Sequence, residues 1–84
     1  MEKLQKDLLE SSDKLVYGTE RNLKLLKNER LKTIYLASNC IENVREEVKR
    51  CNGKTEVVEL DATNTEIKVA CKKPFSISVI GLTK

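Results

Sequence analysis

The apolar residues change from helical to strand-like spacing, and back, all along the chain. In four segments they recur every three or four residues, as on a helix with one buried face. We therefore expect helices over residues 2–12, 19–28, 41–51 and 64–72. Short apolar or alternating runs predict strands over residues 14–17, 33–38, 55–60 and 75–82. This αβαβαβαβ order predicts an α/β or α+β fold, a three-layer α/β/α sandwich around a four-stranded mixed sheet.

Turn and capping residues separate these segments. Gly18 allows a tight turn after the first strand, and Thr19 is expected to cap the second helix. Thr63 and Glu66 have the spacing of a capping box at the start of the fourth helix. Gly53 suits a left-handed position after the third helix. The buried stripe expected on the third helix consists of Ile41, Val44, Val48 and Cys51.

The length permits one domain, residues 1–84. Chains below about 100 residues bury barely enough surface for a single core. Histidine is absent, which excludes Ser-His and Cys-His nucleophiles and every metal site that needs imidazole. The three glycines fit neither G-x-G-x-x-G nor a P-loop, and G-x-S-x-G is also absent. We therefore expect no enzyme, no cofactor and no metal.

The cysteines predict a reducing compartment. Cys40, Cys51 and Cys71 are odd in number and form no C-x-x-C pair. This pattern favours free, buried thiols over disulfides or a zinc site. The alternative is a reactive thiol at Cys71, because Lys72 and Lys73 follow it and cations lower a thiol pKa.

No segment resembles a membrane span or a signal peptide. The longest apolar run, residues 34–37, is far shorter than the roughly 20 residues that cross a bilayer. The N-terminal residues alternate charge and leucine and lack a continuous apolar stretch. We expect a cytoplasmic protein that does not associate with membranes.

Positive charge is concentrated in two segments. The net charge is +3, but residues 14–32 hold six basic and two acidic side chains, and residues 68–84 hold four basic and none acidic. The rest of the chain is net acidic. If the fold brings the two basic segments together, the protein has one positive face.

The segment 18–24, GTERNLK, is the strongest candidate for a binding site. It places a glycine turn and a helix N-terminus where a strand meets a helix, and free N–H groups there bind anions such as phosphate. Arg21 and Lys24 add charge and can bridge guanine O6 and N7. Asn22 is suited either to adenine or to a backbone hydrogen bond. The alternative is the basic, solvated face of an ordinary helix.

Three sequence strings in order point to a known family. They are Gly18 with Lys24 six residues later, TIYLASN at 33–39, and DATNTEIKVACKKPFSISV at 61–79. In this pattern the chain resembles L30e, a family of archaeal and eukaryotic large-subunit ribosomal proteins in the superfamily that also contains L7Ae. The resemblance covers the chain from Lys14 onward. It implies an α/β/α sandwich that binds kink-turn or similar internal-loop RNA and has no catalytic activity.

The resemblance also implies where RNA binds. In the family, RNA lies on the edge formed by the glycine turn, the helix after it and the loop before the last helix. The corresponding residues are Gly18, Thr19, Glu20, Arg21 and Lys24, with Ala62, Thr63, Asn64, Thr65 and Glu66. Cations expected on the phosphate side are Lys27, Lys32, Lys68 and Lys72. The implied partners are ribosomal RNA, the large ribosomal subunit and neighbouring ribosomal proteins.

Among the departures of the chain from the family pattern, two concern the contact with RNA. Glu20 and Arg21 stand where the L7Ae branch has Asn-Glu, the pair that reads guanine. Glu66, Ile67 and Lys68 stand where the family has Glu-Leu-Gly. Glycine there lets RNA approach closely, whereas Lys68 supplies a cation or blocks the approach.

Two alternative functions stay open. One is a subunit of a small ribonucleoprotein such as an RNA-modification guide complex. The other is a protein-interaction module that uses the acidic face of the third helix and has no RNA role.

Overall fold

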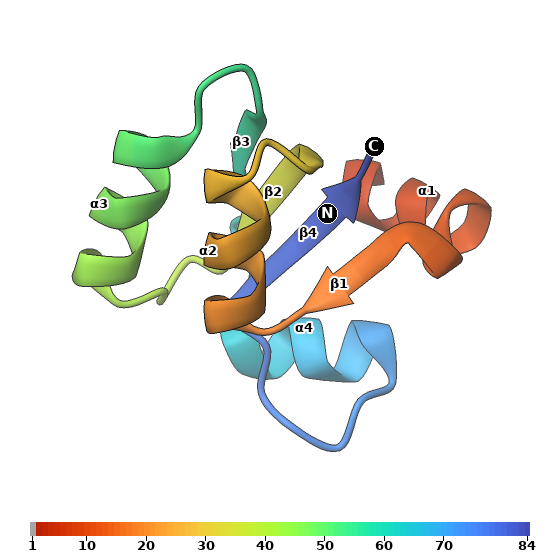
Figure 1. The fold of residues 1–84 in the computed structure, drawn as a ribbon. Helices are drawn as coiled ribbons and strands as arrows, with labels where there is room; N and C mark the ends of the chain where they lie inside the picture. The colour runs from red at the N-terminus through yellow and green to blue at the C-terminus, as the bar shows by residue number, and fades with distance from the viewer. Residues whose placement is uncertain (1) are drawn as a thin grey trace.

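Helices and strands alternate in the order that the sequence predicts (Figure 1). The computed structural model describes residues 2–84. The elements are α1 (Glu2–Glu10), β1 (Leu15–Tyr17), α2 (Thr19–Lys27), β2 (Leu31–Leu36), α3 (Glu42–Cys51), β3 (Glu56–Glu59), α4 (Asn64–Cys71) and β4 (Val79–Thr83). A short 3-10 turn, η1 (Ser12–Lys14), joins α1 to β1.

The last strand of the chain lies inside the sheet. The strand order is β1-β4-β2-β3. β4 runs antiparallel to both neighbours, so that Gly81 lies opposite Val16 on one side and Ile34 on the other. β2 and β3 are parallel, with Tyr35 opposite Val58. The expected four-stranded mixed sheet is therefore confirmed.

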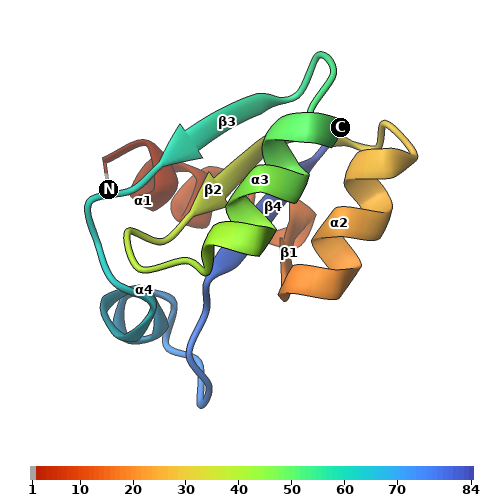
Figure 2. The same cartoon turned by 90° about the vertical axis from the view of Figure 1, so that its left-hand side faces the viewer.

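Helices cover both faces of this sheet (Figure 1 and Figure 2). One apolar cluster joins α2 and α3 to the sheet through Leu26, Val48, Ile34, Leu36 and Val79. A second cluster joins α1 and α4 to the other face through Leu4, Ile67, Tyr35, Ile77 and Ile80. β2 is apolar along most of its length because alternate side chains enter opposite layers. The three-layer sandwich follows from these two cores.

A buried tyrosine anchors α1. Tyr35 points from β2 toward α1 and is fully buried. Its hydroxyl donates a hydrogen bond to the Asp7 carboxylate. Burial, followed by the hydrogen bond and the charge of Asp7, raises the pKa of Tyr35 above its usual value of 10.0. The hydroxyl therefore stays protonated and keeps α1 docked on the sheet.

Two strands differ from their predicted bounds by two residues or more, and the other two by no more than a single residue at either end. The last strand begins at Val79 instead of residue 75. The Ile77 N–H instead donates to the Asn64 carbonyl at the start of α4, 3.3 Å away, and the Ile77 side chain is buried. Residues 75–78 therefore alternate in polarity without joining the ladder. β2 begins two residues early, because Leu31 pairs with Thr83 and is buried.

Helix ends agree with the sequence at some positions and differ at others. The capping box of Thr63 and Glu66 is confirmed. The expected cap at Thr19 is wrong: Gly18 is the N-cap of α2, and Thr19 is the first helical residue. Ile41 was expected in the buried stripe of α3, but it precedes the helix and is 68% exposed.

Burial opposes ionisation of the Cys40 and Cys71 thiols by raising their pKa values. Cys40, Cys51 and Cys71 are all free. Burial raises the pKa of Cys71, and this effect outweighs the charge of Lys73, which lowers it. This does not favour the reactive-thiol alternative. Among residues 2–84, no cluster of three metal-ligating side chains occurs, and no helix is long and apolar enough to cross a membrane.

Candidate nucleic-acid interface

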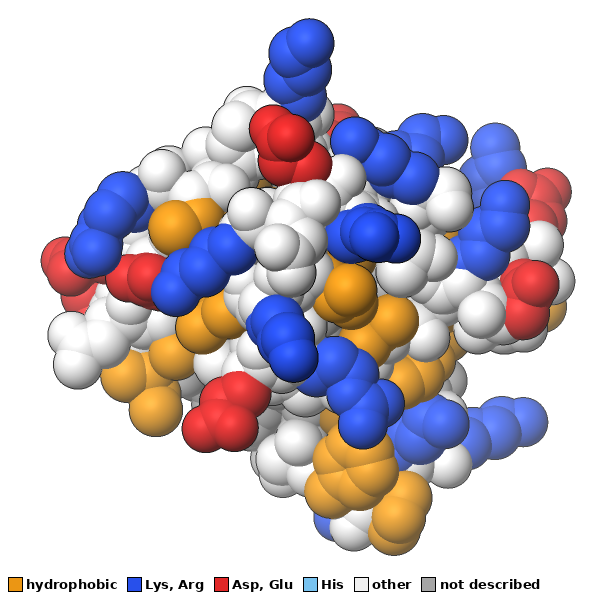
Figure 3. All heavy atoms as spheres, viewed as in Figure 1, with side chains coloured by type: hydrophobic (Ala, Val, Ile, Leu, Met, Phe, Trp, Pro, Cys, Tyr) orange, Lys and Arg blue, Asp and Glu red, His pale blue; other side chains and the backbone are white. Residues whose placement is uncertain are grey.

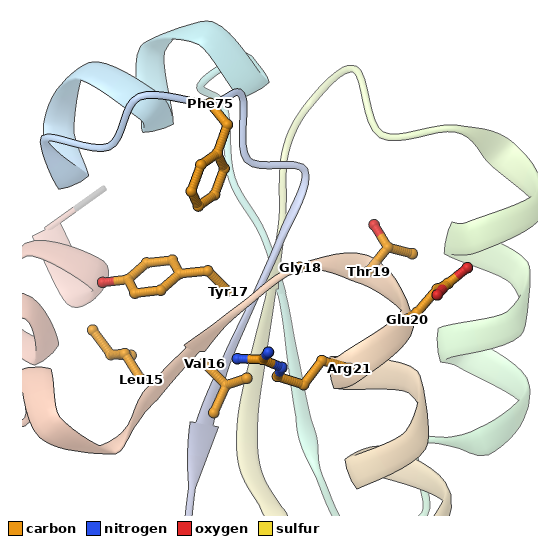
Figure 4. Close-up of a pocket in the computed structure, with 8 residues that line it drawn as sticks. All are labelled: Leu15, Val16, Tyr17, Gly18, Thr19, Glu20, Arg21 and Phe75. Carbon is orange, nitrogen blue, oxygen red and sulfur yellow. The ribbon is translucent and has the colours of Figure 1, made fainter.

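An open cavity lies where β1 passes into α2. Its volume is about 650 Å³. Its walls are the three residues of β1, the Gly18 turn, the first three residues of α2, and Phe75 from the segment between α4 and β4 (Figure 4). It therefore includes most of the GTERNLK segment that the sequence predicts as a site.

The N-terminus of α2 opens toward this cavity. Gly18 has a φ of +114°, which a residue with a side chain rarely adopts. No side chain of the described residues caps the helix, and the N–H groups of a first helical turn have no partner within the helix. Thr19, Glu20 and Arg21 therefore present their N–H groups to an anion.

Asn22 holds the turn in place from beneath. Its side chain is completely buried, and its Nδ2 donates to the carbonyls of Gly18 at 2.6 Å and Val16 at 3.0 Å. Its Oδ1 has no hydrogen-bond partner among the described residues and lies against Gly81 of β4. Asn22 is thus engaged with the protein's own main chain. Contact with adenine is wrong, because the side chain does not reach the surface.

Two aromatic rings border the cavity. Tyr17 comes from β1, and Phe75 from the loop above it (Figure 4). Phe75 is 49% exposed. The Lys73 ammonium lies over the Tyr17 ring, with Nζ 4.6 Å from the ring centroid. Burial, with Cys71 contributing, raises the pKa of Tyr17, so its hydroxyl stays neutral. Phe75 has no sequence signal beyond its place as a single aromatic residue after Pro74.

The loop before α4 lies at the same end of the sheet as the cavity. Unlike α2, the helix α4 has a capped N-terminus. Thr63 and Glu66 bond to each other's backbone N–H groups at 3.0 and 3.3 Å. The Asn64 N–H donates to Oδ1 of Asn39, 2.9 Å away, and the two asparagine side chains also bond to each other. These groups are therefore not free to bind an anion.

Among the loop residues expected at the interface, exposure differs strongly. Ala62 is only 5% exposed and belongs to the core, so its side chain is not available for RNA, contrary to the expectation. Thr65 is exposed at the start of α4. On the same helix, Lys68 is half-buried, and Lys72 is exposed in a left-handed conformation with a φ of 55°.

The expected cations fall into different places. Arg21 and Lys24 are exposed on α2 and take part in no ion pair within the described part of the chain. Lys27 is paired with Glu47 of α3, with 3.3 Å between Nζ and Oε1. Lys32 lies at the opposite end of the sheet, near the start of β2. Lysine and arginine side chains line α2 on the face shown in Figure 3.

Sequence comparison identifies the family. The model of the Ribosomal protein L7Ae/L30e/S12e/Gadd45 family matches residues 1–84. The chain belongs to this family. It is 36% identical to large ribosomal subunit protein eL30 of Archaeoglobus fulgidus over 67 residues, which cover 80% of this chain and 76% of that protein. It is 30% identical to eL30 of Methanosarcina mazei over 69 residues, which cover 82% of this chain and 65% of that protein.

The fold of this L7Ae/L30e-family chain also occurs in solved structures. A Giardia lamblia 15.5kD RNA binding protein superimposes with a TM-score of 0.72, covering 88% of this chain and 63% of that protein. The identity is 19%. The family membership rests on the sequence matches, and this structural match supports the architecture alone.

Proposed function

We propose that the protein binds ribosomal RNA as a component of the large ribosomal subunit in the cytoplasm, without catalytic activity. The observation that carries the proposal is the uncapped N-terminus of α2, which opens beside an exposed aromatic ring. The family supports the choice of RNA, because relatives at 30–36% identity are named large ribosomal subunit proteins.

The chemistry of the cavity fits a bent RNA with unpaired bases. The N–H groups of α2 and the charges of Arg21 and Lys24 bind phosphates. The Phe75 ring offers a face on which a base stacks, and stacking needs a base that has left its duplex. A kink-turn or similar internal loop supplies both features within one site. The Thr19 hydroxyl and the Glu20 carboxylate then lie where they can bond to base edges or sugars.

The start of α4 contributes less than the family pattern implies. Its capping bonds engage Thr63, Asn64 and Glu66, and Ala62 is buried. Thr65 is exposed at the start of this helix. Lys68 and Lys72 supply cations on the same side, for phosphates of the same RNA. We therefore assign base contacts to the α2 side of the interface.

The α2 cations provide the direct test. We expect Arg21→Ala and Lys24→Ala each to weaken binding of a kink-turn RNA by at least about fivefold, because each removes a phosphate or base contact worth about 1 kcal/mol. Gel shift at fixed salt measures this. Lys49→Ala is the matched control, since Lys49 is an exposed cation on α3. Equal, small losses from all three variants would contradict the assignment.

The α3 face does not favour a protein-interaction role. Glu47 pairs with Lys27 and Arg50, while Glu59 of β3 pairs with Arg45 and Lys49. Much of the negative charge near this helix is therefore neutralised within the protein. A role in a small ribonucleoprotein uses the same RNA chemistry. Cross-linking in cell extract, followed by sequencing of the attached RNA, separates it from a ribosomal role.

A further inference from the structure

A second set of cations lies at the end of the sheet opposite the cavity. β1, β2 and β3 begin at this end, and β4 ends there, as the strand pairing requires. Each strand brings at least one basic residue to it. These residues, the far row, are Lys14 before β1, Lys84 after β4, Arg30 and Lys32 at the start of β2, and Lys54 before β3.

Hydrogen bonds to main-chain carbonyls connect neighbouring strands at the far row. The Lys84 N–H donates to the Arg30 carbonyl at 3.1 Å. The Thr83 hydroxyl donates to the Lys14 carbonyl at 3.1 Å. Neighbouring strands lie about 4.8 Å apart, so a row across four strands is roughly 14 Å wide. The main-chain positions that carry these cations are therefore fixed in a row at the end of the sheet.

The far row carries an excess of positive charge. All five of its side chains are exposed, and none belongs to an ion pair within the part of the chain that the structure describes. The acidic side chains next to these cations in the sequence are those of Asp13, Glu29 and Glu56. Five basic side chains therefore stand against three acidic ones. By contrast, the cations of α3 are held in ion pairs.

The helix α2 connects the two ends of the molecule. It begins at the cavity and ends beside Arg30, and its nine residues span about 13 Å. Figure 3 shows Lys and Arg side chains along this helix and on toward the C-terminal end of the chain. The cavity and the far row are thus two ends of one basic surface, separated by the length of α2.

The two ends differ in the RNA that they can recognise. The chain has three aromatic residues. Tyr17 and Phe75 border the cavity, and Tyr35 is buried in the core. The far row therefore has no ring on which a base can stack, and lysines on flexible stems contact phosphates without reading sequence. This chemistry fits the backbone of a paired RNA helix.

We propose that the far row binds the phosphate backbone of a second RNA helix, so that the protein holds two RNA segments at opposite ends of its sheet. The inference rests on the proposed RNA-binding function and extends it. One segment supplies the unpaired bases at the cavity, and the other is a regular duplex. Because phosphate binding releases counterions, duplex binding depends steeply on salt.

The test uses two RNA probes and three variants. The probes are a perfectly paired 20-base-pair RNA duplex and a kink-turn RNA with short flanking helices. The far-row variant is Lys14→Ala/Lys32→Ala/Lys54→Ala. The control variant Lys6→Ala/Lys49→Ala/Arg50→Ala removes the same charge from exposed residues of α1 and α3. The cavity variant is Arg21→Ala/Lys24→Ala. Circular dichroism and thermal unfolding establish that each variant is folded.

We expect the far-row variant to bind the duplex at least about tenfold more weakly than the control variant. Its plot of log K against log salt should flatten by about 2 to 3 units, since each phosphate contact contributes about 0.9. Its affinity for the kink-turn RNA should change less than threefold. The cavity variant should show the reverse pattern, which makes failure of the proposed function distinguishable from failure of this inference.

Two results would overturn the inference. The first is equal duplex binding by the far-row and control variants. The second is binding of the wild type to phosphatidylserine vesicles that is tighter than its duplex binding and is lost in the far-row variant, since the surface would then serve a membrane. If only kink-turn binding fails in the wild type, the proposed function fails while the duplex result still reports on the far row.

Discussion

The turn that opens the interface depends on one buried side chain. Asn22 has an ordinary place in the sequence, between two residues of a basic helix, and its polarity suggested contact with RNA. In the structure its Nδ2 donates to the carbonyls of Val16 and Gly18, while Gly81 of β4 leaves the space that its Oδ1 occupies. The burial of Asn22 has no local sequence signal, because the glycine that leaves room for its Oδ1 lies 59 residues away in sequence.

We expect Gly81→Ala to destabilise the protein by about 1–3 kcal/mol. A Cβ at this position would lie 1.9 Å from Oδ1 of Asn22 and 2.8 Å from Cδ2 of Leu31. Urea unfolding measures the loss. In an Asn22→Ala background the same substitution should cost clearly less, because the closer clash is gone, and a double-mutant cycle reports this coupling. Additive losses in the free energy of unfolding would show that the added Cβ at residue 81 does not clash with the Asn22 side chain.

Phe75 should contribute to RNA binding and little to stability. Its ring borders the cavity and is 49% exposed, and stacking of one base on an aromatic ring is worth about 1–3 kcal/mol. We expect Phe75→Ala to weaken kink-turn binding by about fivefold or more with a small change in melting temperature. Phe75→Trp should retain affinity. If Phe75→Leu binds as well as the wild type, the ring acts by packing and not by stacking.

At the scale of elements, features set by neighbouring residues were predictable from the sequence, and features set by contacts between distant segments were not. The capping box of α4 involves residues three apart, so the sequence predicts it and the structure confirms it. The closing of the same N-terminus by Asn39 was not predictable, since it depends on where β2 ends relative to α4. The late start of β4 was not predictable for the same reason. Ile77 is buried through its contact with α4, so residues 75–78 alternate in polarity as a strand does without being part of the sheet. For the candidate site, the sequence predicted the α2 turn but not its aromatic wall.

Asn39, in the turn after β2, should stabilise α4 by capping it. Its Oδ1 accepts from the Asn64 N–H, and its Nδ2 donates to Oδ1 of Asn64. We expect Asn39→Ala to lower the free energy of unfolding by about 1 kcal/mol, similar to loss of a helix cap. Amide hydrogen exchange should speed up in the first turn of α4. Unchanged exchange at Asn64 would contradict this role, and α2 serves as the internal reference.

At the scale of the whole molecule, the central position of β4 gives the sheet two unlike ends. β1, β2 and β3 run in one direction. β4 lies between β1 and β2 and runs in the opposite direction to both. This arrangement brings residues from distant parts of the sequence to each end. The two basic segments, residues 14–32 and 68–84, contribute cations at both ends of the sheet. The single basic face expected from the charge count therefore consists of two separate clusters, one at the cavity and one at the far row.

The stability of the whole molecule should fall at alkaline pH. The pKa values of Cys40, Cys71, Tyr17 and Tyr35 are all raised in the folded state, chiefly by burial. Below pH 9 both folded and unfolded chains keep these protons, so the full stability is present. Above about pH 9 for the thiols and pH 10 for the phenols, the unfolded chain loses protons first and becomes relatively more stable.

Tyr35→Phe isolates the contribution of the largest of these shifts. At pH 7 the variant should be less stable than the wild type, because Asp7 loses the donor that docks α1. As the pH rises from 10 toward the raised pKa of Tyr35, only the wild type bears the cost of keeping this phenol protonated. The difference between the two urea midpoints should therefore narrow between pH 7 and pH 11. A constant or widening difference would mean that the Tyr35 hydroxyl is not held neutral by burial and Asp7.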